Sequence, residues 1–145
     1  MYLFHIVLEG IQMNTKNILT LIAVVMGLQS VGIFVGREAI VTDAFAPMNP
    51  DATGIKIGMM MHEVIAVFGL TITSILLAAR NLPSAAGSRV LMGASVGLAL
   101  TVAHGVWNVF TTLVKPPLPL LLIMGALTVV GFITASKAAN QDSAQ

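Results

Sequence analysis

The sequence predicts an all-α integral membrane protein, a four-helix bundle in which antiparallel helices run up and down. The 145-residue chain is 57% hydrophobic and 9% charged, and its mean hydropathy is +0.93. A soluble domain usually carries about 25% charged residues. The apolar residues gather in four stretches long enough to cross a bilayer, which takes about 20 residues: 17–36, 57–79, 90–114 and 118–136. We expect one transmembrane domain over residues 1–145.

Prolines mark the connections between the four stretches, because proline interrupts a helix: Pro47, Pro50, Pro83, Pro116 and Pro117. The second and third connections are short, which makes the helices on either side of each antiparallel neighbours. The first connection, residues 37–56, is longer. Its first part, residues 37–45, is compatible with a short amphipathic helix at the membrane interface.

The N-terminal region has alternative interpretations. Ala44-Phe45-Ala46 resembles a signal-peptidase site. The apolar run 17–36 exceeds the roughly 7–15 residues of a signal-peptide core, however, and ends well before that site. We therefore expect an uncleaved helix. Residues 1–12 either precede a translation start at Met13 or form a genuine interfacial segment.

Lysine and arginine predict the orientation of the bundle. Four of the seven lie at the N-terminus, the second connection and the C-terminus, and three lie on the opposite side. Basic residues are enriched in cytoplasmic loops, so we expect both termini in the cytoplasm, in a bacterial cytoplasmic (inner) membrane.

Composition also excludes several classes of activity. A net charge of +1 argues against nucleic acid, which needs a concentrated basic face. The chain has no cysteine, which excludes disulfides and thiolate metal sites. A zinc site would need at least three protein ligands, and no such set is visible, so no metal site is predicted.

Glu63 is the only carboxylate within any of the four apolar stretches. Charges inside a membrane are costly and usually face a bundle interior. At about 1.5 Å per residue, Glu63 and the preceding His62 lie about 10 Å below the first-connection side of the membrane. Asn108 and Gln29 reach a similar level on the third and first helices, and His104 lies about 15 Å deep. These five side chains define a predicted polar layer.

Small residues at helical spacing predict how the helices pack. A stripe of small and polar residues follows one face of the third helix and includes Gly93, Gly97, His104 and Asn108. Glycines in this spacing let a neighbouring backbone approach closely, and Gly32 and Gly36 share a face of the first helix with Gln29. We expect helices one to three to pack tightly, leaving a polar pocket open to the non-cytoplasmic side. The fourth helix would be a supporting wall.

The polar layer has several interpretations. Asn108 and Gln29 are often hydrogen-bonding glue between helices. A Glu–His pair can take and release protons beside a cavity, which suits quinone chemistry or proton-coupled transport. His62 and His104 could ligate a b-type haem, but they are the single candidate pair and haem is disfavoured.

The run Met61-His62-Glu63-Val64-Ile65-Ala66-Val67-Phe68-Gly69-Leu70 follows a helix and a polar loop and precedes a short loop, Arg89 and a helix rich in small residues. This order resembles the DoxX-like superfamily of small four-helix bacterial membrane proteins, over residues 19–135. The resemblance supports Glu63 as a functional position. It also implies a link to membrane oxidoreductase systems that pass electrons to quinone.

Three functions remain open. The first is a membrane subunit of a quinone-linked redox system, with a larger membrane or soluble oxidoreductase as partner. The second is a non-catalytic accessory or scaffold protein whose polar layer is interhelical glue. The third is a small proton-coupled transporter, which would need a homo-oligomer. The sequence leaves open whether the protein is an enzyme.

Overall fold

The chain forms four long helices over residues 14–142, the part that the computed structural model describes. Each helix is long and apolar enough to cross a membrane. They are α2 (Thr15–Phe45), α3 (Ala52–Ala79), α4 (Ser84–Thr111) and α5 (Leu118–Asp142), with a short 3-10 helix, η1 (Ala46–Met48), after α2. The all-α fold and the multi-pass membrane class are thus confirmed. The alternatives for residues 1–12 and Met13 lie outside the described residues.

Local capping explains where two of the helices begin. The Asn14 side chain accepts a hydrogen bond from the backbone N–H of Asn17 at 2.9 Å and starts α2. The Asp51 side chain accepts one from Gly54 N–H at 2.7 Å and starts α3. Both bonds satisfy donors that a helix N-terminus leaves unpaired.

The first helix is longer than the apolar stretch that predicts it. Residues 37–45 continue α2 to Phe45 and do not form a separate interfacial helix. The first connection is therefore only residues 46–51. The reason is that polar residues such as Arg37 and Glu38 are compatible with a helix, and the first proline comes at Pro47.

The other helices also differ from their apolar stretches: several of their ends extend beyond the stretch, but the C-terminal end of α4 falls short of it. The cap at Asp51 moves the start of α3 to Ala52, and α4 begins at Ser84, directly after Pro83. At its other end α4 stops at Thr111, because Thr112 is extended and two prolines follow at 116 and 117. α5 continues to Asp142. Helices end at caps and breakers, whereas apolar stretches end at the membrane boundary.

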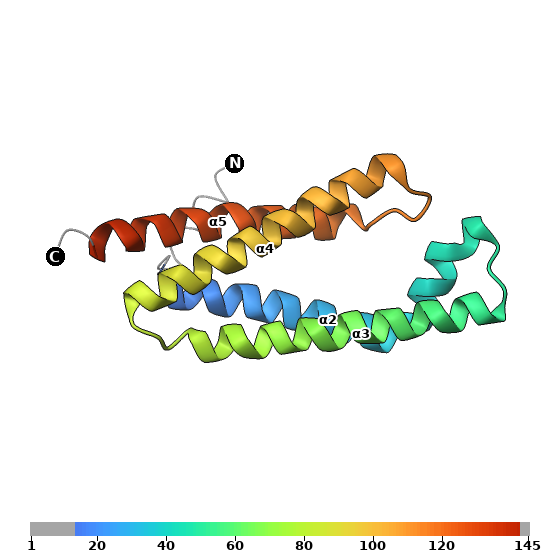
Figure 1. The fold of residues 1–145 in the computed structure, drawn as a ribbon, viewed down its shortest axis with the longest axis horizontal. Coiled ribbons are helices and arrows are strands. Elements are labelled where there is room, and N and C mark those ends of the chain that lie inside the picture. Colours follow the sequence, from blue (N-terminus) through green and yellow to red (C-terminus); the bar gives the residue numbers. More distant parts are fainter. Residues whose placement is uncertain (1–13, 143–145) are drawn as a thin grey trace.

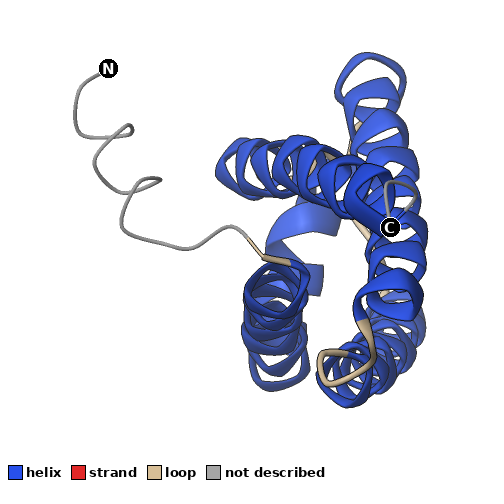
Figure 2. Cartoon of the chain, turned by 90° about the vertical axis from the view of Figure 1, so that its left-hand side faces the viewer, coloured by secondary structure: helices blue, strands red, loops and turns tan. Residues whose placement is uncertain are grey.

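The four helices are arranged as two antiparallel pairs, α2 with α3 and α4 with α5 (Figure 1). We call the end that holds residues 46–51 and 112–117 the distal end. The basal end holds the start of α2, the end of α5 and residues 80–83. Figure 1 shows the pairs diverging toward the distal end, and the view from the basal end shows α4 tilted away from α3 (Figure 2). The expected tight packing of the first three helices is not formed, because α3 and α4 barely touch.

Small residues fix the contacts within each pair. A Cβ built on Gly69 of α3 would collide with Ser30 Oγ of α2, and a Cβ built on Gly131 of α5 would collide with Ser95 Oγ of α4. Both serine hydroxyls donate to the carbonyl four residues earlier at 2.8 Å, so neither leaves an unpaired polar group at the crossing. Close approach at small residues is the usual basis of helix packing in lipid, where burial of apolar surface gives no advantage.

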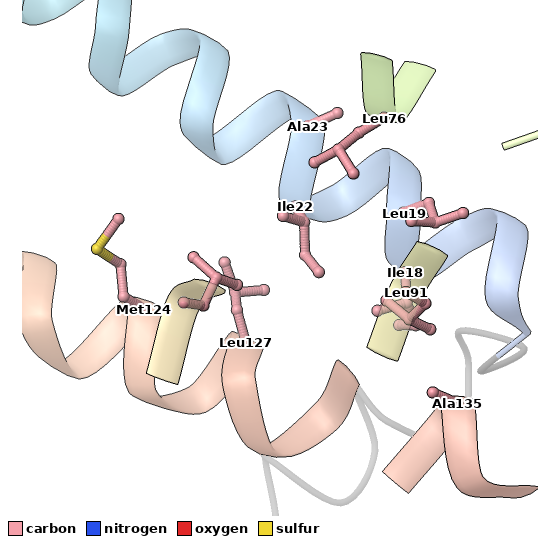
Figure 3. Close-up of a cluster of buried hydrophobic side chains, with 10 residues drawn as sticks. Ile18, Leu19, Ile22, Ala23, Leu76, Leu91, Met124, Leu127 and Ala135 are labelled. Carbon is pink, nitrogen blue, oxygen red and sulfur yellow. The ribbon is translucent and has the colours of Figure 1, made fainter. Parts of the chain in front are cut away.

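A cluster of buried side chains joins the two pairs near the basal end (Figure 3). It combines residues of all four helices: Ile18, Leu19, Ile22, Ala23, Leu76, Leu91, Leu98, Met124, Leu127 and Ala135. Figure 3 shows Ile22 of α2 and Leu127 of α5 pointing toward one another across this cluster, while Ala23 of α2 points toward Leu76 of α3. The basal half is therefore closely packed, and the divergence is confined to the distal half.

Candidate functional site

Glu63 is paired with a residue that the sequence places outside the membrane segments. Its Oε1 atom lies 2.7 Å from Arg37 Nε, and the two side chains are 41% and 30% exposed. Arg37 Nη1 donates a hydrogen bond to the carbonyl of Phe34 at 2.5 Å, and the guanidinium lies 5.1 Å from the centre of the Phe34 ring. Arg37 Nε is buried without a hydrogen bond, so its contact with Glu63 is an ion pair rather than a hydrogen bond.

The continuation of α2 beyond residue 36 is what makes this pair. Arg37 follows residue 17 by about 30 Å along the helix, which is the thickness of a hydrocarbon core. Glu63 lies about 24 Å from Ala79 along α3. The carboxylate therefore lies close to the distal membrane boundary, and the arginine reaches it from that boundary. A shallow pocket of about 290 Å³ surrounds Glu63 and is otherwise apolar, with Phe34, Val64, Val67 and Phe68.

His62 is partly buried and is bonded within α3. Its Nδ1 atom lies 2.8 Å from the carbonyl of Gly58. A carbonyl can only accept, so Nδ1 carries a proton. The Nδ1–H group of His62 is thus satisfied by its own helix.

His104 and Asn108 form a pair on α4. Asn108 Nδ2 lies 3.1 Å from His104 Nε2. An amide nitrogen can only donate, so His104 Nε2 accepts and its proton resides on Nδ1. The His104 side chain is exposed, which leaves this Nδ1 donor and the second N–H of Asn108 available to a ligand.

The small-residue stripe of α4 faces a cavity between the two helix pairs. Gly93, Gly97 and Thr101 line this cavity of about 280 Å³, and Ile72, Leu76, Met26 and Met124 line it from the other three helices. His104 follows Gly97 by seven residues and lies within about 20° of it around the helix. The stripe thus continues from the cavity through His104 and Asn108 into the diverging distal half.

Glu63 lies on a different face. It precedes the cavity residue Ile72 by nine residues, which is about 180° around α3. Its partner is on α2, whereas the partner of His104 is on α4. The structure therefore divides the sequence-predicted layer into an Arg37–Glu63 pair and a His104–Asn108 pair. Gln29 is partly buried on α2 and bonds to neither.

The glycines expected to pack helices together do not do so. A Cβ built on Gly32, Gly93 or Gly97 would have no atom within 4 Å, and one on Gly36 would meet only Ile40 of the same helix. The close approaches occur instead at Gly58, Gly69, Gly105 and Gly131. Spacing along one helix identifies a small face, but the rotation of the helix decides whether a neighbour covers it.

Arg37 is the site residue that sequence reasoning missed. Arg37 could have been recognised as the partner of Glu63 because it directly follows the first apolar stretch, at a depth where Glu63 needs a counter-charge. Among the described side chains of residues 14–140, no three His, Asp or Glu residues come together as metal ligands would.

Comparison with known proteins adds no relative. No family model matches the chain, and no curated protein or solved structure matches it.

Proposed function

We propose that the protein binds a quinone between its two helix pairs, as a membrane subunit of a quinone-linked redox system. One observation carries the proposal. On the α4 stripe, a Cβ built on Gly93 or Gly97 would have no atom within 4 Å, and the stripe connects an apolar cavity with two unused hydrogen-bond donors. A quinone has the same two parts, an apolar tail and a ring with two carbonyl oxygens.

Different residues would bind the apolar tail and the ring of the quinone. The cavity beside Gly93 and Gly97 takes the apolar part, since its lining is mostly hydrophobic. His104 Nδ1–H and the Asn108 amide donate to the ring carbonyls, and such donors fix the orientation of a ligand in a largely apolar pocket. Reduction of the quinone to a quinol takes two electrons and two protons. The electrons come from an oxidoreductase partner. Both protons come from the aqueous phase at the distal end, and His104 is placed to relay one of them to the nearer carbonyl oxygen.

The proposal also assigns the protein a membrane, an orientation and a role for Glu63. We place the protein in the bacterial cytoplasmic membrane with its basal end in the cytoplasm, because Lys16, Arg80, Arg89 and Lys137 gather there. The resemblance to the DoxX-like superfamily supports the same redox assignment and stays a prediction. In this proposal Glu63 has a positioning role, since it holds Arg37 at the distal end of the α2–α3 pair.

A second function is favoured by the Arg37–Glu63 contact. Both residues belong to one helix pair, which is the arrangement expected of interhelical glue in a non-catalytic accessory or scaffold protein. In that case quinone does not bind, and changes at His104 affect stability alone.

The single tryptophan gives a direct test. Trp107 is the neighbour of Asn108 and is 66% exposed. We expect a benzoquinone with a short alkyl tail to quench Trp107 fluorescence saturably in the purified protein. His104→Ala should weaken binding about two- to tenfold, the usual value of one hydrogen bond.

Thr71→Val is the matched control, because Thr71 is exposed on α3 and bonds only to the carbonyl of Val67. It should leave the quinone affinity unchanged. Quenching that does not saturate, or equal affinity in the wild type and His104→Ala, would contradict the proposed function. A lower melting temperature of His104→Ala without quinone binding in the wild type would instead support the accessory protein.

A further inference from the structure

A pocket of about 330 Å³ lies at the basal end, on the opposite side of the membrane from His104 and Asn108. It is formed where α2 and α4 begin and where α3 and α5 end. Ligand pockets in proteins usually occupy roughly 300–1,000 Å³. This pocket is therefore large enough for a small polar group, and nothing in the proposed quinone site uses it.

Three cations line the pocket. They are Lys16 at the start of α2, Arg80 after α3 and Lys137 near the end of α5. None of the three forms an ion pair with a carboxylate of residues 14–140, and the described lining contains no carboxylate. Arg37 at the distal end differs, since Glu63 neutralises it. The basal pocket thus concentrates positive charge that the described chain leaves uncompensated.

Buried polar atoms in the pocket also lack partners. Thr134 is 3% exposed, and its Oγ1 atom makes no hydrogen bond. Thr128 on the same helix bonds back to the carbonyl of Met124 at 2.8 Å, so an unbonded hydroxyl is not general for this helix. Arg80 Nε is likewise buried without a partner. A buried polar group without a hydrogen bond is costly, and both of these atoms belong to residues that line the same pocket.

The N-terminus of α4 adds to the positive electrostatic potential in this pocket. α4 begins beside the pocket at Ser84, and the residue before it is Pro83, which provides no side-chain cap. The first N–H groups of a helix have no partner within the helix and carry partial positive charge. Backbone donors, three cations and a buried hydroxyl together form the environment that an oxyanion requires.

We propose that this basal pocket binds a phosphate group. Lys16, Arg80 and Lys137 supply its counter-charge, and the Thr134 hydroxyl and Arg80 Nε–H donate to its oxygens. The pocket residues flank the apolar segments of all four helices, so they lie at the level where the headgroups of one leaflet lie. The phosphate belongs either to an anionic phospholipid or to a soluble phosphate compound, and the two sources require the same contacts.

Purified protein in a phosphate-free non-ionic detergent tests the proposal. Its melting temperature is measured with short-chain phosphatidylglycerol and, separately, with inorganic phosphate, and the affinity is obtained from the titration. We expect one of the two to raise the melting temperature saturably. Each cation at a membrane surface contributes about fivefold to affinity. Lys16→Gln and Lys137→Gln should therefore each weaken binding by about that factor, and Thr134→Val should weaken it too.

Two controls separate the pocket from general surface charge. Arg89→Gln removes a basal cation that does not line the pocket, and Thr128→Val removes a hydroxyl of α5 that is already bonded. Both should bind like the wild type. Stabilisation by phosphatidylglycerol alone identifies the lipid as the source, and stabilisation by inorganic phosphate identifies a soluble compound. The proposal is overturned if neither ligand stabilises the protein, or if Arg89→Gln lowers the affinity as much as Lys137→Gln.

Discussion

At the scale of single residues, the ion pair with Arg37 explains how a membrane helix can tolerate the Glu63 carboxylate. A carboxylate at the centre of a membrane helix costs about 2.5–3.5 kcal/mol. Glu63 avoids much of this cost in two ways, because it lies near the distal boundary and because Arg37 Nε lies 2.7 Å away. The pair is partly exposed, so we regard it as a local stabilising contact between α2 and α3 and not as a buried proton-transfer group.

A double-mutant cycle on this pair tests that conclusion. Glu63→Ala leaves the arginine without its counter-charge, and Arg37→Ala leaves the carboxylate alone. We expect each single variant to lose roughly 1–2 kcal/mol of unfolding free energy, less than the cost of a charge at the membrane centre. The double variant should lose no more than either single variant, because no lone charge remains. Unfolding is measured in lipid bicelles. Additive losses in the double variant would show that the two side chains do not interact.

At the scale of helices, close approaches at single glycines decide which helices pair. Gly69→Ala would force Ser30 out of the position in which it donates to the carbonyl of Met26. Overpacking of this kind costs about 1–3 kcal/mol, so we expect a net loss of stability and a lower melting temperature. Ser30→Ala in the same chain should restore part of the loss, since it removes the colliding oxygen.

Gly93→Ala is the matched control for the helix prediction. A Cβ at Gly93 has no neighbour within 4 Å, and alanine favours the helix by about 1 kcal/mol over glycine. We expect Gly93→Ala to be as stable as the wild type or more stable. If Gly93→Ala and Gly69→Ala were equally destabilising, the pairing of helices described above would be wrong.

The four helices could be predicted from the sequence because apolar composition alone defines stretches of membrane length. Their ends could not, because Arg37 and the residues after it are polar yet contain no helix breaker. The pairing could be predicted only in part. The short third connection predicted that α4 lies beside α5, which is confirmed, but the short second connection equally predicted that α3 lies beside α4, and these two helices barely touch. Gly93 and Gly97 form a better motif than Gly69, but only the rotation of α3 against α2 brings Gly69 to Ser30. The site was also predicted only in part. Helical spacing placed His104 and Asn108 on one face of α4, where they are bonded to each other. The pairing of Glu63 with Arg37 was missed, because Arg37 was assigned to a loop.

At the scale of the whole molecule, the two ends differ in packing and in charge. The basal half holds the buried cluster that joins the pairs and a pocket lined by uncompensated cations. In the distal half the pairs diverge and the described ion pair is neutral. This asymmetry places a proposed quinone site and a proposed phosphate site at opposite membrane surfaces.

The difference in positive charge between the two ends predicts how the protein is oriented in the membrane. Four of the seven lysine and arginine residues lie at the basal end and three at the distal end, so the preference for a cytoplasmic basal end is small. Lys16→Gln combined with Lys137→Gln reverses the balance to two against three. We expect the wild type to place its C-terminus in the cytoplasm and the double variant to show a mixed or inverted orientation.

Reporter fusions at Gln145, one active only in the cytoplasm and one only outside it, measure this orientation in cells. Lys115→Gln is the control, because it removes a distal cation and should strengthen the wild-type orientation. A C-terminus outside the cytoplasm in the wild type would reverse the assignment of both ends. The phosphate pocket would then face the outer leaflet, while the binding measured in detergent, which has no sides, would be unaffected.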